Sequence, residues 1–322
     1  MKTDETIPDV LGAAHRFAHD AMATTFEIWI AHPDAVYAEQ AAWAAFEEVD
    51  RLEQELSRYV EDSDIARISN LATGESLRIG LAAFECLRLC TRMYAETNGA
   101  FDGTIGSVVD CWFKEDGPGD SPSQEDLNLA RQRTGMHRIE LDEVEHTVRL
   151  HTSPIQIDLG GIGKGYAVDR VAALLRDWSI DAALIHGGRS SVLALGAPPG
   201  TKGWPVTLTN PCDREETLAY FYLQDRALGG SGLRKGQHII DPRSGRPVKD
   251  RCAAWCGGPA AAIADALSTA FMVMNPDEVE RYCSSHSGTL AMVVTKVRRK
   301  ETQGTRILRY GPWESDGRQK QS

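Results

Sequence analysis

The sequence predicts an α+β fold in which helices are interspersed among strands that form mixed sheets. Apolar residues recur at the three-to-four-residue spacing of helices in two segments, 43–56 and 81–94. Three other segments, 23–31, 146–158 and 182–197, have the apolar and β-branched composition of strands. The two kinds of segment do not alternate regularly, so a wound parallel sheet is not favoured.

The first predicted elements are a strand at 23–31 and a helix after it. Pro33 and Asp34 are suited to the start of that helix. Its apolar face is predicted from five residues at helical spacing, namely Trp43, Phe46, Val49, Leu52 and Leu56. A second amphipathic helix runs from Leu81 to Tyr94 and is expected to end near Asn98-Gly99, because an Asn-Gly pair terminates helices.

The most linker-like segment of the chain is 115–125. Strands are predicted at 146–158 and 182–197, with one helix between them at 164–178. Residues 260–274 are apolar and small, which indicates a buried helix.

The length of 322 residues suits one large domain or two closely packed ones. We expect an N-terminal extension at 1–19, one functional unit at 20–313 and a polar tail at 314–322. Within the unit, lobes at 20–155 and 156–313 are predicted.

The charge balance excludes some partners. The chain has 35 Lys and Arg against 46 Asp and Glu, a formal charge of −11, so it lacks the basic field that holds nucleic acid or an anionic membrane. A small phosphorylated ligand is compatible with an acidic protein, because backbone amides and a metal can hold phosphate.

Residues 1–30 contain acids, a proline and histidines where a secretory leader needs an apolar stretch. No apolar run has the length of a membrane helix, so we expect a cytoplasmic protein without membrane insertion. The seven cysteines contain no C-x₂-C pair, and buried free thiols are expected.

A glycine-rich segment at 157–175, IDLGGIGKGYAVDRVAALL, is the first candidate for chemistry. Its glycines would let the backbone approach a ligand, and the helix behind them points its N-terminal amides forward. The glycines are Gly160, Gly161, Gly163 and Gly165. The segment matches neither the Walker loop nor the G-x-G-x-x-G fingerprint. Such a turn is also a common tight connection, so phosphate binding stays open at this point.

Two further segments carry polar residues. Asp265 and Thr269 are four residues apart in AAAIADALSTAF and share one helix face, where they suit Mg²⁺ or a satisfied polar pair. In HIIDPRSGRP, Asp241-Pro242 starts a turn that Gly245 can close, and His238 lies just before it. A lone histidine in such a place is usually structural.

Taken in order, the motifs resemble the ApbE family of FAD:protein FMN transferases over roughly 250 residues. The motifs are AMATTFEI at 21–28, LSRYVEDSDIARIS at 56–69, TNGAFDGTIGSVVDCW at 97–112, IDLGGIGKGYAVD at 157–169, HIIDPRSGRP at 238–247 and IADALSTA at 263–270. The resemblance implies a two-lobed fold with FAD in the cleft between the lobes. It also implies transfer of FMN from FAD to a threonine or serine of an acceptor protein, with AMP leaving.

The resemblance implies site residues as well. The implied FAD contacts are Met22, Tyr59, Ala100, Phe101, Asp102, Asp158, Lys164, His238 and Ile239. The implied Mg²⁺ ligands are the Gly161 carbonyl and the side chains of Asp265 and Thr269. Lys164 would neutralise charge, and His238 or Asp158 would remove the acceptor's proton.

This chain departs from the family pattern at 229–240, GGSGLRKGQHII, which is shorter than usual and implies a trimmed hairpin over FAD. Two alternatives to transfer stay open on the sequence. One is a Mg²⁺-dependent FAD pyrophosphatase that gives FMN and AMP, and the other is a non-catalytic FAD-binding protein.

Overall fold

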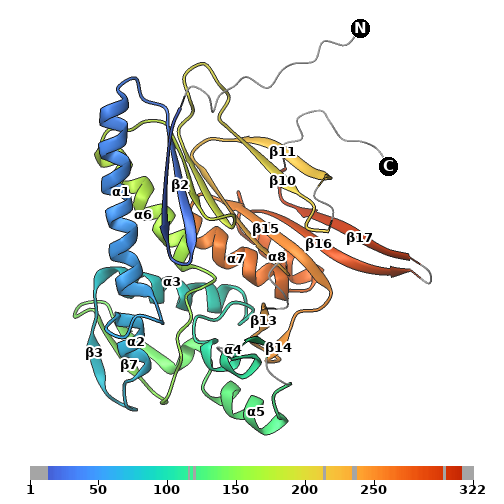
Figure 1. The fold of residues 1–322 in the computed structure, drawn as a ribbon. Coiled ribbons are helices and arrows are strands. Elements are labelled where there is room, and N and C mark those ends of the chain that lie inside the picture. Colours follow the sequence, from blue (N-terminus) through green and yellow to red (C-terminus); the bar gives the residue numbers. More distant parts are fainter. Residues whose placement is uncertain are drawn as a thin grey trace.

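A computed structural model describes residues 14–114, 117–118, 121–212, 215–233, 238–299 and 302–313. It confirms the α+β class, with one large sheet, four small sheets and helices packed among them (Figure 1). Every strand pair of the described residues is antiparallel, whereas the sequence led us to expect mixed sheets.

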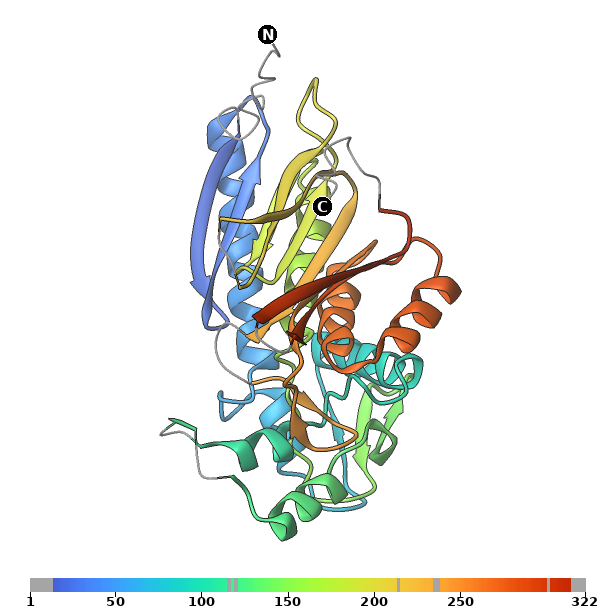
Figure 2. The ribbon, with the colours of Figure 1, turned by 90° about the vertical axis from the view of Figure 1, so that its right-hand side faces the viewer.

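The large sheet has eight strands in the order β1-β2-β8-β9-β12-β15-β16-β17. Their bounds are β1 His15–Ala21, β2 Thr24–Ile30, β8 Ala183–Gly187, β9 Ser191–Leu195, β12 Arg226–Gly232, β15 Arg251–Gly258, β16 Leu290–Arg299 and β17 Thr302–Tyr310. Figure 2 shows the red strands crossing the blue ones at a steep angle, as expected for a twisted sheet.

Side chains alternate between two apolar cores on the two faces of this sheet, because successive residues of a strand point to opposite faces. In β8, Ile185 packs in the larger core and Leu184 in the smaller one. In β16, Val293 and Met292 divide in the same way. Both faces of the sheet are therefore covered.

Three helices cover the face of the larger core, namely α1 (Ala35–Leu56), α6 (Gly163–Asp177) and α7 (Ala261–Val273). The Asp34 side chain caps α1 as predicted, by accepting hydrogen bonds from Val36 and Tyr37 N–H. Trp43 was predicted on the apolar face of α1 but is 56% exposed. The hairpin of β10 (Trp204–Thr209) and β11 (Thr217–Leu223) covers the other face with Trp204 and Leu208.

The remaining elements lie mostly below the large sheet in Figure 1. The helices are α2 Asp64–Ser69, α3 Leu81–Glu96, α4 Gly106–Trp112, α5 Gln124–Gln132, η1 Met136–Arg138 and α8 Pro276–Ser285. The short strands are β3 Ser76–Arg78, β4 Phe113–Lys114, β5 Gly117–Pro118, β6 Ile139–Asp142, β7 Thr147–Leu150, β13 Ile240–Asp241 and β14 Arg246–Pro247.

Two predicted strands differ from the structure. Of 146–158, only β7 at 147–150 is a strand, and the following irregular segment includes Pro154, which has no N–H for a ladder. The stretch 182–197 forms two strands, β8 and β9, separated by a turn in which Gly188 has φ +65°. Sequence composition did not show that turn.

The domain boundaries stay predictions, but the sheet bears on them. Strand β1 begins at His15, so residues 15–19 of the expected extension belong to the sheet. The sheet also pairs β2 with β8 and so crosses the expected lobe boundary at 155/156. Residues 1–13 and the tail 314–322 lie outside the described residues.

Candidate active site

The glycine-rich loop before α6 lies against α7 and against the segment that follows α3. A Cβ atom added at Gly161 would lie 3.2 Å from Thr269 Oγ1 and 3.2 Å from Phe101 Cε2. Three residues that are far apart in the sequence therefore meet at one point. All three were predicted for the site.

Close backbone packing holds α7 in this place. A Cβ at Gly165 would lie 2.3 Å from the Ala261 carbonyl oxygen, and one at Gly229 would lie 2.2 Å from that of Ala264. Only glycine allows such approaches of α7 to α6 and β12. We expected Gly165 to give a ligand access to the backbone, but in the structure it makes room for α7.

Asp265 is a buried carboxylate on α7, with 2% of its surface exposed. Its Oδ2 accepts a hydrogen bond from the Gly165 N–H at 3.1 Å. Burial raises the pKa of Asp265, while the Lys164 charge and the Gly165 N–H lower it by less. The neighbouring groups thus do not fully offset the cost of burying the charged carboxylate, and a bound cation would offset more of it.

Ser231 on β12 orients Thr269. Its Oγ lies 3.0 Å from Thr269 Oγ1 and 2.8 Å from Ser268 Oγ, close enough for hydrogen bonds to both. We did not predict Ser231 for the site. The available signal was the run Gly229-Gly230-Ser231-Gly232, whose small residues permit the close contact with α7.

The residues present fit a magnesium ion. Asp265, Thr269 and the Gly161 carbonyl offer oxygen atoms, and Mg²⁺ prefers oxygen with few protein ligands, sharing phosphate oxygens and water. Among the residues that the structure describes, no group of three or more His, Cys, Asp and Glu side chains could hold a metal ion. An all-oxygen set with one carboxylate suits a hard cation that also binds a phosphate ligand.

Lys164 stands in the first turn of α6. Its Nζ donates a hydrogen bond to the Gly160 carbonyl at 3.0 Å, and its charge acts on Asp265. Ile162 occupies the N-cap position of α6 and has no side-chain group that could cap the helix. The positive end of the helix and the Lys164 ammonium thus lie in one place, which favours an anion there.

Asp158 is held by two donors. Its Oδ1 accepts from the Gly160 N–H at 2.8 Å, and its Oδ2 accepts from Arg58 at 3.0 Å. Arg58 also donates to both oxygens of Asp110, at 2.7 and 2.8 Å. Burial lowers the pKa of Arg58, but the two carboxylates outweigh it and raise the pKa above its ordinary value.

Met22 and Tyr59 both lie outside the helices and strands, on connecting segments. Met22 has φ 51° and Ala23 φ 55° in the two-residue turn between β1 and β2, a conformation that favours glycine or asparagine. Tyr59 is 87% exposed, and its ring centroid lies 5.5 Å from the Arg58 guanidinium carbon. Their roles as FAD contacts stay predictions.

Ala100, Phe101 and Asp102 are buried. Asp102 Oδ1 accepts hydrogen bonds from the Thr104 N–H at 2.8 Å and from its hydroxyl at 2.6 Å. Burial raises the pKa of Asp102 to about 6, although both Thr104 hydrogen bonds lower it. Asp102 lies on the wall of a cavity of about 480 Å³, whose other polar residues include Tyr94, Asn98, Arg131, Arg138 and Arg243.

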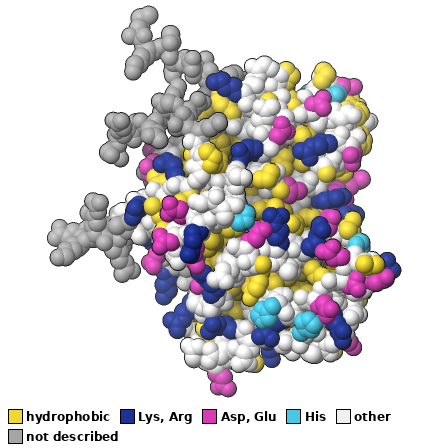
Figure 3. All heavy atoms as spheres, turned by 180° about the vertical axis from the view of Figure 1, so that it is seen from behind, with side chains coloured by type: hydrophobic (Ala, Val, Ile, Leu, Met, Phe, Trp, Pro, Cys, Tyr) yellow, Lys and Arg dark blue, Asp and Glu magenta, His cyan; other side chains and the backbone are white. Residues whose placement is uncertain are grey.

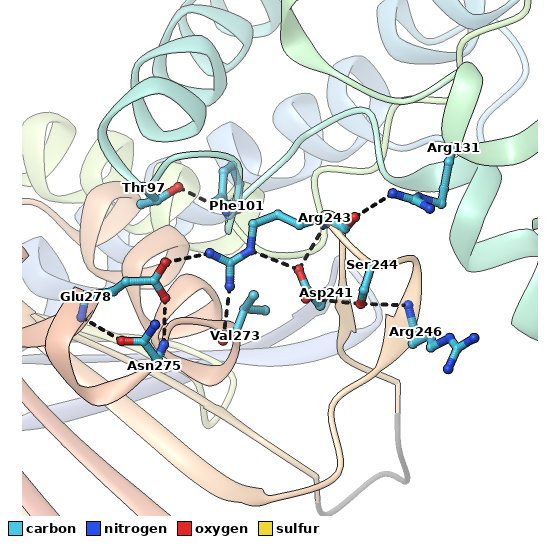
Figure 4. A network of polar contacts seen from close by, with 10 residues as sticks. All are labelled: Thr97, Phe101, Arg131, Asp241, Arg243, Ser244, Arg246, Val273, Asn275 and Glu278. Atoms are coloured by element: carbon cyan, nitrogen blue, oxygen red, sulfur yellow. Dashed lines mark hydrogen bonds and ion pairs between the residues drawn. The ribbon is translucent and has the colours of Figure 1, made fainter. Parts of the chain in front are cut away.

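The predicted turn at 241–245 is confirmed. The Gly245 N–H donates to the Asp241 carbonyl at 2.7 Å, and Gly245 has φ +69°. Figure 4 shows Arg243 reaching from this turn towards Glu278, to which it donates at 2.8 Å, while its Nε lies 3.3 Å from Asp241 Oδ1. Glu278 forms the capping box of α8 with Asn275.

This network fixes the segment that starts with His238 and Ile239. The Ile239 side chain is buried in the larger core, and its carbonyl accepts from the Val248 N–H at 2.9 Å. His238 is exposed at the start of the segment, and its catalytic role stays a prediction. Residues 234–237 of the shortened stretch lie outside the described residues.

Three comparisons with known proteins show what the chain is similar to. A model of the ApbE family matches residues 22–294. The FAD:protein FMN transferase of Escherichia coli (strain K12) is 26% identical over 264 residues, which cover 77% of this chain and 75% of that protein. The FAD:protein FMN transferase of Klebsiella pneumoniae (strain 342) is 25% identical over 288 residues, which cover 85% and 82%.

Solved structures show the same fold. The apo form of the Pseudomonas stutzeri flavinyl transferase ApbE superposes with a TM-score of 0.80 at 25% identity, covering 92% of this chain and 95% of that one. The flavin transferase ApbE from Vibrio cholerae gives a TM-score of 0.81 at 22% identity, covering 92% and 97%.

Proposed function

Because the chain belongs to the ApbE family, we propose that it transfers the FMN moiety of FAD to a threonine or serine hydroxyl of an acceptor protein and releases AMP. The observation that supports the proposal is the approach of Gly161 to Thr269 on α7, one helical turn from the buried Asp265, whose carboxylate feels the Lys164 charge. These residues offer a cation site next to a helix N-terminus, which is where a pyrophosphate can be held.

The reaction breaks the phosphoanhydride bond that joins the FMN and AMP halves of FAD and forms a phosphoester bond to the acceptor. The acceptor hydroxyl oxygen attacks the phosphorus of the FMN half, and the bond from that phosphorus to the AMP phosphate breaks. When bound, Mg²⁺ supplies positive charge to the phosphate oxygens. Lys164 and the N-terminal amides of α6 stabilise the same developing charge and fix the pyrophosphate for in-line attack.

The proton of the acceptor hydroxyl needs a base, and His238 and Asp158 are the two candidates. Both carboxylate oxygens of Asp158 already accept hydrogen bonds, from Gly160 and from Arg58. Taking a proton would weaken at least one of these bonds. We therefore assign Asp158 to positioning the loop and His238 to proton removal.

The ligand preference follows from the same geometry. The loop and the cation site would both bind the pyrophosphate, which FAD has and which FMN and riboflavin lack. The protein should bind FAD at least about tenfold more tightly than FMN, the ratio that corresponds to roughly 1.4 kcal/mol. Fluorescence titrations in the presence of Mg²⁺ measure this, and equal affinity for FMN would contradict the assignment of the loop.

The transfer itself is tested by incubating the full chain with FAD, Mg²⁺ and a purified candidate acceptor from the same organism. AMP release and the mass of the acceptor are read from the same sample. Transfer predicts one AMP for each acceptor that gains the mass of an FMN moiety.

Two other results would overturn transfer. AMP together with free FMN and an unchanged acceptor indicates a pyrophosphatase. Bound FAD without AMP, for every acceptor offered, indicates a binding protein. A matched sample without Mg²⁺ controls for uncatalysed hydrolysis.

A further inference from the structure

Two cysteine thiols that are 40 residues apart in the sequence lie side by side on the sheet face away from α6 and α7. The Sγ atoms of Cys212 and Cys252 are 3.3 Å apart. Both cysteines are free, Cys212 exposed and Cys252 buried in the smaller core. Cys212 lies on the loop that joins β10 and β11 and Cys252 on β15, and neither takes part in the candidate active site.

A β-bulge directs Cys252 to this face. In β15 and β16, Arg251 pairs with Thr295 and Ala253 with Val294, so Cys252 is an extra residue between two pairs. Farther along β15, Ala254 and Cys256 point into the larger core, and strict alternation would send Cys252 there too. The bulge turns its side chain to the hairpin instead.

The loop that carries Cys212 is held in place by a buried asparagine. Asn210 is 3% exposed, and its Oδ1 accepts a hydrogen bond from the Cys212 N–H at 2.9 Å. Its Nδ2 donates to Glu216 at 2.5 Å, and its N–H donates to the Glu216 carbonyl at 2.9 Å. The hydrogen bond to Asn210 holds the Cys212 backbone, and the bulge sets the direction of Cys252.

We propose that Cys212 and Cys252 are a site of reversible oxidation, at which a small disulfide such as oxidised glutathione links the two thiols and fastens the β10–β11 loop to β15. The site lies apart from the flavin chemistry, so it goes beyond the proposed function.

The reaction proceeds by two exchanges. The Cys212 thiolate attacks one sulfur of the oxidant, breaks its S–S bond and releases one glutathione thiolate. The Cys252 thiol loses its proton, attacks Cys212 Sγ and releases the second glutathione thiolate. Overall two S–H bonds are lost and one S–S bond forms in the protein, while the oxidant gains two electrons and two protons.

Exposure sets the order of the two steps. Cys212 is open to the reagent, whereas burial raises the pKa of Cys252 to about 12, with the neighbouring thiol adding to the rise. Lys296 lies close enough to lower the pKa of Cys252 somewhat. Cys252 thus acts second, once the mixed disulfide has formed beside it.

The test counts thiols in the full chain. The reduced protein is incubated with oxidised glutathione, denatured, labelled with a maleimide and weighed by mass spectrometry. The chain has seven cysteines, and we expect two fewer labels than on the reduced protein, with no glutathione retained. Peptide mapping should recover residues 212 and 252 in one cross-linked pair, and dithiothreitol should restore all labels.

Three variants make the result specific. Cys212→Ser should lose no thiols to a disulfide, and Cys252→Ser should retain one glutathione on Cys212. Cys111→Ser, the matched control at another partly exposed thiol, should behave as the wild type. Any of three results would overturn the proposal. They are seven labels on the treated wild type, glutathione left on Cys212, and a pairing of Cys212 with another cysteine.

A second measurement does not depend on the variants. A cross-link between two ordered segments reduces the freedom of the unfolded chain, so oxidation should raise the melting temperature by several degrees. Dithiothreitol should reverse the rise. An oxidised protein with two fewer labels and a lower melting temperature would show that the native positions do not accommodate the link.

Discussion

Arg58 joins two carboxylates, Asp158 beside the glycine-rich loop and Asp110 on α4, and only 13% of its side chain is exposed. It was not predicted, because within LSRYVED it looks like any surface arginine next to the aromatic residue that the resemblance singled out. Its two partners, Asp110 and Asp158, lie 52 and 100 residues away in the sequence, so no local pattern reveals these contacts.

Arg58 should therefore act as a positioning residue for Asp158. Arg58→Gln removes the charge that holds Asp158 Oδ2, and we expect kcat/KM for AMP release from FAD to fall about tenfold. Asp110→Asn is the matched control, because it removes the half-exposed partner and leaves the Asp158 contact intact. Steady-state kinetics of both variants check this, and equal losses would mean that Arg58 acts through Asp110.

Asp102 gives a pH dependence to stability. Its pKa is raised by burial from 3.8 to about 6, so the folded state prefers the neutral carboxyl. Stabilisation by that proton is present below about pH 3.8 and is lost as the pH rises through about 6. The Asp102→Asn protein keeps an acceptor for Thr104 and does not titrate.

The difference in unfolding free energy, Asp102→Asn minus wild type, should rise between pH 4 and 7 by at most about 3 kcal/mol. Urea unfolding of the two proteins at several pH values measures it, and their shared titrating groups cancel in the difference. A difference that stays constant over this range would refute the raised pKa.

The turn at 241–245 is bonded to three neighbouring helices. Arg243 connects it to Glu278 at the start of α8, and the Arg243 carbonyl accepts from Arg131 on α5 at 2.7 Å. The Trp112 indole N–H donates to the Gly245 carbonyl at 2.8 Å. The turn thus joins elements from both halves of the chain and fixes the segment of Ile239.

Arg243→Met should loosen this turn. We expect the free energy of unfolding to fall by about 1–2 kcal/mol, since charge-assisted hydrogen bonds at a half-exposed side chain are lost. The Kd for FAD should rise as well. Arg246→Met, an exposed arginine of the same turn, is the matched control and should change neither quantity in urea unfolding and FAD titration.

Helices and strands were predicted correctly where the local sequence signals were strong. The helices α1, α3, α6 and α7 were predicted to within a few residues, because apolar spacing and end signals such as Asp34 and Asn98-Gly99 agree. The strand segment at 182–197 concealed a turn, since buried strands on both sides are apolar without alternation. Local sequence patterns did not predict which distant strands pair, such as β2 with β8.

For the whole molecule, the formal charge is −11, and on the face seen from behind acidic and basic side chains are interspersed without a dominant basic area (Figure 3). None of the helices in the described part of the chain is long and apolar enough to cross a membrane. The cytoplasmic location stays a prediction. The partners that we propose for the protein are FAD and an acceptor protein.

The sequence allowed the candidate site to be proposed as a set of residues but not as a geometry. The resemblance suggested Gly161, Asp265 and Thr269. In the structure, Gly161 in the loop before α6 lies against Thr269 on α7. Ser231 and Arg58 were missed because each acts on a predicted residue from another strand or loop. A side chain that supports another one carries no signature in its own sequence neighbourhood.

The central claim is that Asp265, Thr269 and the Gly161 carbonyl form the magnesium site of an FMN transferase. AMP release from FAD, measured against Mg²⁺ concentration, tests it most directly. Asp265→Asn removes the only carboxylate of the proposed set and should abolish release, whereas Thr269→Val keeps the shape and should raise the required Mg²⁺ about tenfold. Folding of both is checked by circular dichroism. Mg²⁺-dependent AMP release that survives nearly unchanged in a folded Asp265→Asn protein would contradict the account.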